Sequence, residues 1–338
     1  MTMRTLILAG FSDSVIKFRG PLINSLRDKG VEVHVGAPGL LESPGVIARL
    51  RQLGAHPHET PMARAGTNPI SDAGYLWMLW AKARTLAPDF VLAYTVKPVI
   101  YGTLAAWLAR VPRRYVLITG LGFAFTAGRR GVVSAIVRRM YRMALNLATK
   151  VFFQNPDDER LFRETGLLAP SVPSVVVNGS GVDVKEYSVN PFPSGGVSFL
   201  MIGRLLGDKG VREYAQAARR VRALHPQVRF RLVGWIDSNP DAISQSELDA
   251  WLAEGALEFL GRLDDVRPAI ADSTVYVLPS YREGTPRTVL EAMAMGRPII
   301  TTDAPGCRET VVDGDNGFLV PVQSVDALVA AMLRFIED

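Results

Sequence analysis

Two glutamates separated by seven residues, Glu283 and Glu291, lie in a stretch whose residue types suit an anion and a sugar together. Carboxylates repel a diphosphate, but they accept hydrogen bonds from sugar hydroxyls on either side of one. A tight loop followed by a helix presents backbone N–H groups and the positive end of a dipole to an anion. The stretch therefore predicts a site for a nucleotide sugar.

The elements around the two glutamates follow from the local sequence. Residues 275–279 are apolar and β-branched, which predicts a buried strand. Thr285 is the expected N-cap of the next helix, Pro286 suits its first turn, and Gly296 marks its end. The order of strand, loop and helix thus places Glu283 in the loop and Glu291 on the second helical turn.

A second glycine-rich turn, residues 203–210, follows another apolar strand. In α/β sheets such a turn lies where ligands bind, and two cations within it, Arg204 and Lys209, suit a diphosphate. The turn matches neither the phosphate loop that ends in Gly-Lys-Ser/Thr nor the Gly-x-Gly-x-x-Gly dinucleotide pattern. Taken alone, it fits a solvated loop equally well.

These residues together resemble the signature of retaining glycosyltransferases of family 4, which have the GT-B fold. The resemblance extends over almost the whole chain. It includes segments similar to the family's interdomain, base-binding and later loops, at residues 178–183, 259–263, 306–310 and 313–317.

The resemblance implies a role for each matching residue. Arg204 and Lys209 would neutralise the donor diphosphate, Glu291 would bind the ribose, and Glu283 the transferred hexose. The implied catalytic residues are Glu283, Arg204 and Lys209, and the implied donor-binding residues are Glu291, Gly284, Thr285, Pro286, Arg287, Gly261, Arg262, Leu263, Gly203 and Ser12. No cofactor or metal is expected, because arginine and lysine stabilise the leaving group.

The N-terminal half is similar to enzymes that extend undecaprenyl-diphosphate-linked sugars, often with an N-acetylhexosamine from a UDP donor. Residues 11–14, 18–23, 94–98 and 118–126 carry this similarity, and we expect Lys97 and Thr119 on the acceptor side. Many relatives have a histidine near position 119, but this chain has none between His58 and His225. A front-face retaining mechanism, in which the leaving phosphate assists the acceptor, therefore fits best.

Alternating strand-like and helix-like segments predict two doubly wound α/β domains in tandem. We expect an N-terminal acceptor domain at residues 1–185, a linker at 186–196 and a nucleotide-sugar domain at 197–338. In the GT-B fold these Rossmann-like domains face each other across a cleft. Related enzymes usually continue past the last helix, so a C-terminal crossover segment beyond Asp338 is expected to be missing or truncated.

The net charge of +5 is unevenly distributed. Up to Asn178 there are 22 Lys/Arg and 11 Asp/Glu, and from Gly179 onward there are 16 and 22. A basic first half suggests an anionic partner. Residues 129–143 predict a basic amphipathic helix with an apolar stripe (Val133, Ile136, Val137, Met140, Met143) beside Arg138, Arg139 and Arg142. It could lie on an anionic membrane or bury the stripe in the core, and the same choice holds for residues 76–80.

The remaining residues limit the function further. One cysteine, Cys307, predicts a packed side chain in a reducing compartment, and the four histidines lack metal-ligand spacing. The sequence contains no signal peptide or membrane span. We expect a cytoplasmic enzyme, peripheral on the inner face of the membrane, with a nucleotide-sugar donor and a lipid-linked glycan acceptor but no nucleic acid or obligate protein partner. The alternatives are a GDP-sugar transferase, a GT-B UDP-sugar 2-epimerase and a nucleic-acid-binding protein.

Overall fold

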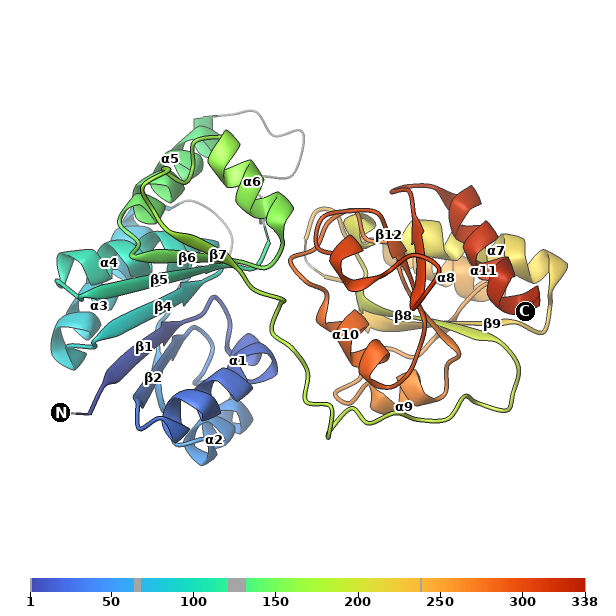
Figure 1. The fold of residues 1–338 in the computed structure, drawn as a ribbon, viewed down its shortest axis with the longest axis horizontal. Coiled ribbons are helices and arrows are strands. Elements are labelled where there is room, and N and C mark those ends of the chain that lie inside the picture. The colour runs from blue at the N-terminus through green and yellow to red at the C-terminus, as the bar shows by residue number, and fades with distance from the viewer. Residues whose placement is uncertain (1, 64–67, 121–131, 238, 338) are drawn as a thin grey trace. The chain divides into compact units, whose positions relative to one another are not determined.

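The structure is a computed structural model that describes residues 2–63, 68–120, 132–237 and 239–337 (Figure 1). The described part of the chain divides into two compact units, one up to Val177 and one from Asn178 onward. The sequence placed the end of the first domain at residue 185.

The first unit is a parallel sheet in the order β3-β2-β1-β4-β5-β6-β7. Its strands are β1 (Arg4–Leu8), β2 (Glu32–Ala37), β3 (His56–Glu59), β4 (Phe90–Tyr94), β5 (Arg113–Ile118), β6 (Lys150–Phe153) and β7 (Ser174–Val176). Its helices are α1 (Ser12–Asp28), α2 (Pro44–Gln52), α3 (Pro69–Leu86), the π-helical η1 (Pro98–Gly102), α4 (Thr103–Leu108), α5 (Val132–Asn146) and α6 (Pro156–Glu164).

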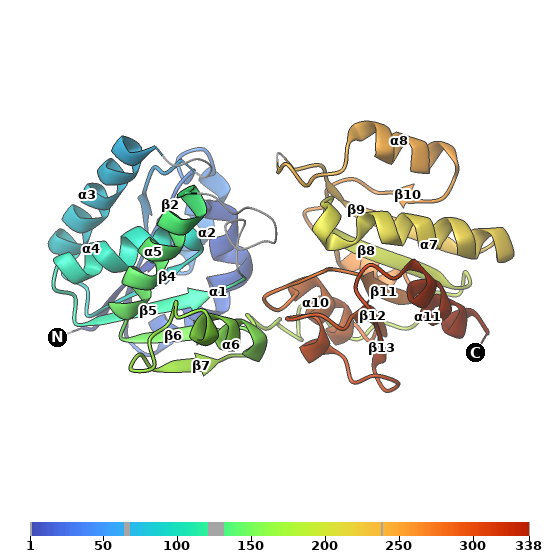
Figure 2. The same ribbon diagram turned by 90° about the horizontal axis from the view of Figure 1, so that it is seen from above.

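The sheet of the first unit has a hydrophobic core on each face. On one face α1 and α2 pack over side chains such as Ile7 and Val35. On the other face α3, α4, α5 and α6 pack over side chains such as Leu6 and Val116. Figure 2 shows α3, α4 and α5 gathered in this second layer.

The second unit repeats the architecture with the sheet order β10-β9-β8-β11-β12-β13. Its strands are β8 (Ser198–Arg204), β9 (Arg229–Trp235), β10 (Glu258–Phe259), β11 (Val275–Leu278), β12 (Ile299–Thr302) and β13 (Gly317–Val320). Its helices are α7 (Val211–Leu224), α8 (Gln245–Ala253), α9 (Arg267–Ala271), α10 (Arg287–Ala294) and α11 (Val325–Glu337), with 3-10 turns η3 (Gly207–Lys209) and η4 (Arg308–Thr310).

The strand order of the second unit fixes where a ligand can bind. Strands β8 and β11 are parallel neighbours, but the chain leaves β8 through α7 toward β9 and leaves β11 through α10 toward β12. The two connections therefore diverge at the carboxyl ends of β8 and β11, which is the topological switch point of a doubly wound sheet. The glycine-rich turn at residues 203–210 and the loop that contains Glu283 both lie there.

The segment expected to be a linker packs against the second unit. Tyr187 is only 9% exposed within the core of that unit. The guanidinium of Arg297 donates hydrogen bonds to the carbonyls of Asn190 and Pro191, at 3.1 and 2.8 Å. These contacts hold residues 187–191 against the second unit.

Candidate active site

The loops after β8 and β11 touch through their backbones. Gly210 has a φ of 73°, and a Cβ added there would lie 2.2 Å from the carbonyl oxygen of Pro279. The amide of Tyr281 donates to the carbonyl of Asp208 at 2.8 Å. Only glycine permits this approach, so residue 210 sets the distance between the two walls of the site.

Across this contact Lys209 and Glu283 form an ion pair, Nζ to Oε1. Their side chains are 17% and 14% exposed, and the Ser280 hydroxyl donates to the same Oε1 at 2.7 Å. A carboxylate that is held by two partners in a partly buried site has a defined orientation. The structure therefore brings together the predicted cation and the predicted sugar-binding acid, which are 74 positions apart in the sequence.

The loop after β12 contacts the backbone of Glu283. The Glu283 amide donates to the carbonyl of Pro305 at 2.9 Å, and Gly306 has a φ of 82°. A Cβ at Gly306 would lie 2.2 Å from the carbonyl oxygen of Glu283 and 2.6 Å from that of Gly284. The Thr302 hydroxyl donates to the carbonyl of Ser280. This loop therefore fixes the backbone that carries Glu283, the predicted sugar-binding acid.

Glu291 lies on α10 with its side chain almost buried. The carboxylate is 8% exposed and accepts a hydrogen bond from Arg287 Nε at 2.7 Å, one helical turn away. Burial, together with the neighbouring Glu291 carboxylate, raises the pKa of Tyr187 to about 12. Glu291 is therefore held on one side by a cation and on the other by a phenol, and it has a fixed orientation.

The start of α10 differs from the sequence prediction by one residue. Thr285 was expected as the N-cap, but Pro286 occupies that position and the helix begins at Arg287. Pro286 has an extended ψ of 108° and no side-chain capping bond. At the other end, Gly296 follows the last turn with a φ of 77°, which confirms the predicted stop. Gly284 and Thr285 thus belong to the loop that leads into the positive end of α10.

Arg204 is the last residue of β8 and lies apart from the Lys209–Glu283 pair. Its guanidinium is 45% exposed and pairs with Asp237 at 3.0 Å, in the loop after β9. Next to Arg204, the Gly203 carbonyl oxygen lies so close to Gly234 that a Cβ added at Gly234 would lie 2.0 Å from it. Arg204 therefore lies on the β9 side of the switch point.

The predicted base-binding turn follows β10. The Gly261 carbonyl accepts from the amide of Gly234 at 2.9 Å, and Leu263 packs against the core. The guanidinium of Arg262 lies 4.9 Å from the ring centre of Trp235. Trp235, at the end of β9 and 41% exposed, is a flat aromatic surface that the sequence reading missed. Its position directly after Gly234 at a strand end was the available signal.

Sequence reasoning also missed the acidic residues behind the glycine-rich turn. Burial raises the pKa of the Asp208 carboxyl, and the neighbouring Lys209 opposes that shift. The hydroxyl of Tyr281 donates to Glu213 at 2.6 Å, and burial raises the pKa of Tyr281 to about 12. These contacts fix the turn from the α7 side.

The predicted site residues of the first unit each have contacts of their own. Ser12 begins α1, is 7% exposed, and shares a hydrogen bond with Ser43 at 3.3 Å. The ammonium of Lys97 pairs with Asp72 at 2.7 Å, and Asp72 accepts from Tyr101 at 2.9 Å. Thr119 follows β5 directly. The roles of Ser12, Lys97 and Thr119 stay predictions, and residues 121–126 of the acceptor motif lie outside the described residues.

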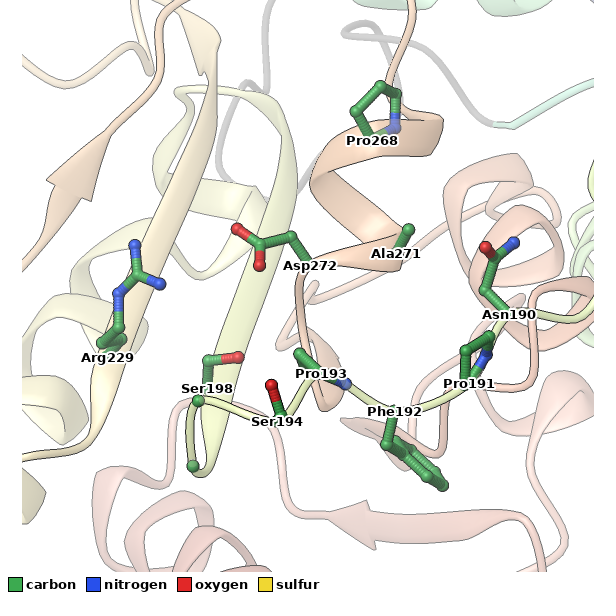
Figure 3. A pocket seen from close by; sticks show the side chains of 12 residues that line it. Asn190, Pro191, Phe192, Pro193, Ser194, Ser198, Arg229, Pro268, Ala271 and Asp272 are labelled. Atoms are coloured by element: carbon green, nitrogen blue, oxygen red, sulfur yellow. The ribbon is translucent and has the colours of Figure 1, made fainter.

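A separate pocket of about 640 Å³ lies beneath the segment at residues 190–196 (Figure 3). It is lined by Ser198, Arg229 and Asp272. Because Ser198 begins β8, the pocket lies at the amino ends of the strands, opposite the switch point at their carboxyl ends. It contains none of the predicted site residues, so this hollow is not the candidate active site.

The cysteine and histidine predictions can be compared with the structure. Cys307 is fully buried, and burial raises the pKa of its thiol to about 12, which confirms a packed side chain. Among the described residues, no group of three His, Cys, Asp or Glu side chains is arranged to hold a metal ion. Within the same ranges no helix has the length and apolar composition needed to cross a bilayer.

Family models match most of the chain. One described as "Glycosyl transferases group 1" matches residues 196–338, and one described as a "Glycosyl transferase 4-like domain" matches residues 19–179. These two matches together span most of the chain, which therefore belongs to the glycosyltransferases. It is therefore an enzyme that transfers a sugar, and the predicted family is confirmed.

Two curated relatives of this glycosyltransferase are similar over most of their length. The N,N'-diacetylbacillosaminyl-diphospho-undecaprenol alpha-1,3-N-acetylgalactosaminyltransferase of Campylobacter jejuni is 28% identical and covers 99% of this chain and 90% of its own. The UDP-Gal:alpha-D-GlcNAc-diphosphoundecaprenol alpha-1,3-galactosyltransferase of Escherichia coli is 28% identical and covers 80% of this chain and 72% of its own.

Solved structures confirm the GT-B fold. The HepE protein of Anabaena, in complex with UDP and glucose, has a TM-score of 0.76 at 19% identity, covering 99% of this chain and 90% of its own. The sucrose-phosphate synthase of Thermosynechococcus elongatus has a TM-score of 0.79 at 18% identity, with the same coverage.

Proposed function

We propose that this glycosyltransferase moves a hexose or N-acetylhexosamine from a UDP-sugar to a polyprenyl-diphosphate-linked sugar in bacterial surface glycan or glycoprotein biosynthesis. The observation that carries the proposal is the Lys209–Glu283 pair at the switch point of the second unit, beside the amino end of α10. The carboxyl ends of β8 and β11 thus carry a cation, a helix N-terminus and a carboxylate. This combination suits a diphosphate joined to a sugar.

The transfer breaks the bond between the sugar's anomeric carbon and a phosphate oxygen of the donor. Negative charge then grows on the nucleoside diphosphate, and Lys209, assisted by Arg204, would stabilise it. Both cations are fixed by carboxylate partners, so little reorganisation is needed as the charge develops. With this charge stabilisation supplied by side chains, we propose that the reaction needs no divalent cation.

Glu283 and Glu291 would recognise the two sugars of the donor. The Glu283 carboxylate is held by Lys209 and Ser280 and would accept hydrogen bonds from the transferred hexose. Glu291, fixed by Arg287, would accept them from the ribose hydroxyls. Trp235 and Arg262 offer a flat, cationic surface near the turn expected to line the base.

We propose that the sugar is transferred with retention of its anomeric configuration, on one face of the donor. In this mechanism the departing phosphate oxygen accepts the proton of the attacking acceptor hydroxyl as the new glycosidic bond forms. The contacts of Glu283 support this route, because its carboxylate is already engaged by Lys209 and Ser280.

A lipid-linked acceptor is supported by the two curated relatives, whose names specify undecaprenol diphosphate acceptors. One of those names also specifies a UDP donor, which supports UDP over GDP. Because such an acceptor is anchored in the bilayer, we propose that the enzyme acts as a peripheral protein on the inner face of the cytoplasmic membrane.

The test is a donor screen with the full chain. UDP-, GDP- and ADP-linked hexoses and N-acetylhexosamines are incubated with an undecaprenyl-diphosphate-linked sugar, with and without EDTA, and product and nucleotide are measured. We expect acceptor-dependent release of UDP, unaffected by EDTA, and a product with the donor's anomeric configuration by NMR. Release of GDP would refute the UDP donor, and donor isomerisation without acceptor would identify an epimerase.

Variants test the site itself. Glu283→Gln and Lys209→Ala each should lower kcat/KM by about 100-fold or more, because each removes a charge from the reacting region. Glu254→Gln and Lys29→Ala change exposed residues of the same types and serve as matched controls. Near-full activity of either site variant, with unchanged folding by circular dichroism, would refute the assignment.

A further inference from the structure

The outward side of α3 in the first unit lacks charged residues where a solvated helix would carry them. No charged residue occurs between positions 73 and 81, and Asp72 is turned inward to Lys97. Ile70 is 85% exposed and Trp77 is 67% exposed, and the ring of Trp77 packs on that of Trp80 at 4.6 Å. A helix that is apolar on both sides requires a second apolar environment.

The neighbouring helices in the same layer also expose apolar side chains. Trp107 and Leu108, at the end of α4, are 46% and 45% exposed. On α5, Ile136 is 53% exposed and Met143 is 44% exposed. The three helices pack side by side over one face of the sheet (Figures 1 and 2). We call these exposed apolar residues of α3, α4 and α5 (Ile70, Trp77, Trp107, Leu108, Ile136 and Met143) together the α3–α5 surface.

The predicted apolar stripe of α5 is divided between the core and the exposed side of the helix. Val137 and Met140 pack against the core, but the residues that α5 buries most deeply are Tyr141, Ala144 and Leu145. Ile136 and Met143 instead face outward, in line with Arg139 at helical spacing. Val133 is among the side chains that the structure does not describe. The apolar residues of α5 thus lie on two sides of the helix.

The positive charge of the first unit is concentrated in the segment of the sequence that carries most of this surface. Residues 73–156 contain twelve Lys/Arg and one Asp, a net charge of +11, whereas residues 1–72 (8 and 6) and 157–178 (2 and 4) sum to zero. Arg138, Arg139 and Arg142 of α5 are all exposed. The entire charge excess of the first half therefore belongs to the segment that contains most of α3 and all of α4 and α5.

We propose that the α3–α5 surface docks on an anionic phospholipid membrane. Tryptophan and aliphatic side chains insert at the boundary of head groups and acyl chains, while arginines beside them attract anionic lipids. A nucleic acid would satisfy the arginines but leave Ile70, Leu108 and Met143 in water, so the apolar residues favour the lipid. The inference rests on the proposed function in one respect, because a lipid-linked acceptor is reached from a membrane.

Vesicle sedimentation with the full chain tests the docking without donor or acceptor. We expect binding to vesicles of phosphatidylglycerol and phosphatidylcholine in equal parts, weaker binding at high salt, and little binding to phosphatidylcholine alone. Replacing Arg138, Arg139 and Arg142 by alanine should weaken binding by about 100-fold, since each cation contributes about fivefold. Trp77→Ala should weaken it by about tenfold.

Matched controls use the second unit. The triple change of Arg219, Arg220 and Arg222 to alanine removes equal charge from α7, and Leu224→Ala removes an apolar side chain that is 65% exposed. Both should bind vesicles as the unaltered chain does. Equal effects of the matched variants would overturn the assignment of the surface. Binding to DNA in place of vesicles would overturn the proposal that the partner is a phospholipid membrane.

A transfer assay separates this inference from the proposed function. Trp77→Ala should retain transfer to a water-soluble, short-chain acceptor analogue while losing transfer to acceptor embedded in vesicles. If vesicles are not bound but the analogue is glycosylated, the docking surface is wrong and the proposed function stands. If vesicles are bound but no acceptor is glycosylated, the docking stands and the proposed function is wrong.

Discussion

Replacing Gly210 by alanine tests whether the contact between the β8 and β11 loops positions the site. The added Cβ would lie 2.2 Å from the carbonyl oxygen and 2.7 Å from the carbonyl carbon of Pro279, at a φ of 73°. The left-handed conformation costs about 1–2 kcal/mol for alanine, and moving backbone to relieve the overlap costs about 1–3 kcal/mol more. We expect the free energy of unfolding of the second unit to fall by about 2–5 kcal/mol.

Gly255→Ala is the matched control. Gly255 also has a left-handed φ, 66°, but no atom lies within 4 Å of the added Cβ. This variant should pay only the conformational cost of about 1–2 kcal/mol and keep its activity. The difference between the two variants in urea unfolding therefore isolates the overlap with Pro279.

The activity of Gly210→Ala should fall more than its stability suggests. The overlap must separate Lys209 from Glu283, and a displacement near 1 Å in a reacting site can lower the rate by about 100-fold. We therefore expect kcat/KM for transfer to fall by about 100-fold under conditions in which the protein is still folded. Equal stability and activity in Gly210→Ala and Gly255→Ala would refute the reasoning.

Three other predictions concern Gly306, His58 and Cys307. Gly306→Ala should lower kcat/KM by about 100-fold, because the added Cβ would overlap the Glu283 carbonyl. Gly314→Ala should not lower it, since Gly314 has a similar φ but open space around the added Cβ. Equal activities of the two variants would contradict the role of the loop after β12 in supporting Glu283. Burial and the nearby Lys82 lower the pKa of His58 to about 4, from 6.5, so the unfolded chain binds the proton more readily between these values. Stability should therefore fall as the pH drops from about 6.5 to 4, and a thermal-unfolding series should show a smaller fall in His58→Gln. Cys307 should react with iodoacetamide only after unfolding, and rapid labelling of the native protein would contradict its burial.

The sequence predicted that the two loops lie close together, because both follow strand ends. In a doubly wound sheet, loops after neighbouring strands converge, so two loops 70 residues apart could be assigned to one site. The ion pair between Lys209 and Glu283 could not be predicted, because it depends on the backbone contact at Gly210. The N-cap at Pro286 instead of Thr285 has a similar cause, since the loop is fixed by its contact with Gly306.

Helices of the first unit were harder to predict. The sequence reading missed α3, because its apolar residues surround the helix and leave no 3.6-residue period. It found α5 but left open whether the apolar stripe is buried or exposed, because Ile136 and Met143 continue the apolar pattern beyond the buried side. Both cases occur where apolar side chains are exposed, so the departure from the amphipathic pattern itself marks the α3–α5 surface.

The two units resemble each other at their switch points, and this likeness gives a last prediction. In the first unit a Cβ at Gly10, after β1, would lie 2.3 Å from Thr95 Oγ1, after β4. Thr95 is a β-branched residue at a φ of 68°, and its hydroxyl has no hydrogen-bond partner among the described residues. In both units, then, the loop after the first strand needs a glycine because the loop after the fourth strand lies against it.

The difference lies in what the glycine touches. Gly210 meets a backbone carbonyl, which no substitution removes, whereas Gly10 meets a side chain. Gly10→Ala should therefore destabilise the first unit by about 1–3 kcal/mol, and Thr95→Gly should abolish most of that loss by removing both the hydroxyl and the strain. A double-mutant cycle by urea unfolding measures the coupling, and additive effects would show that the two loops do not touch.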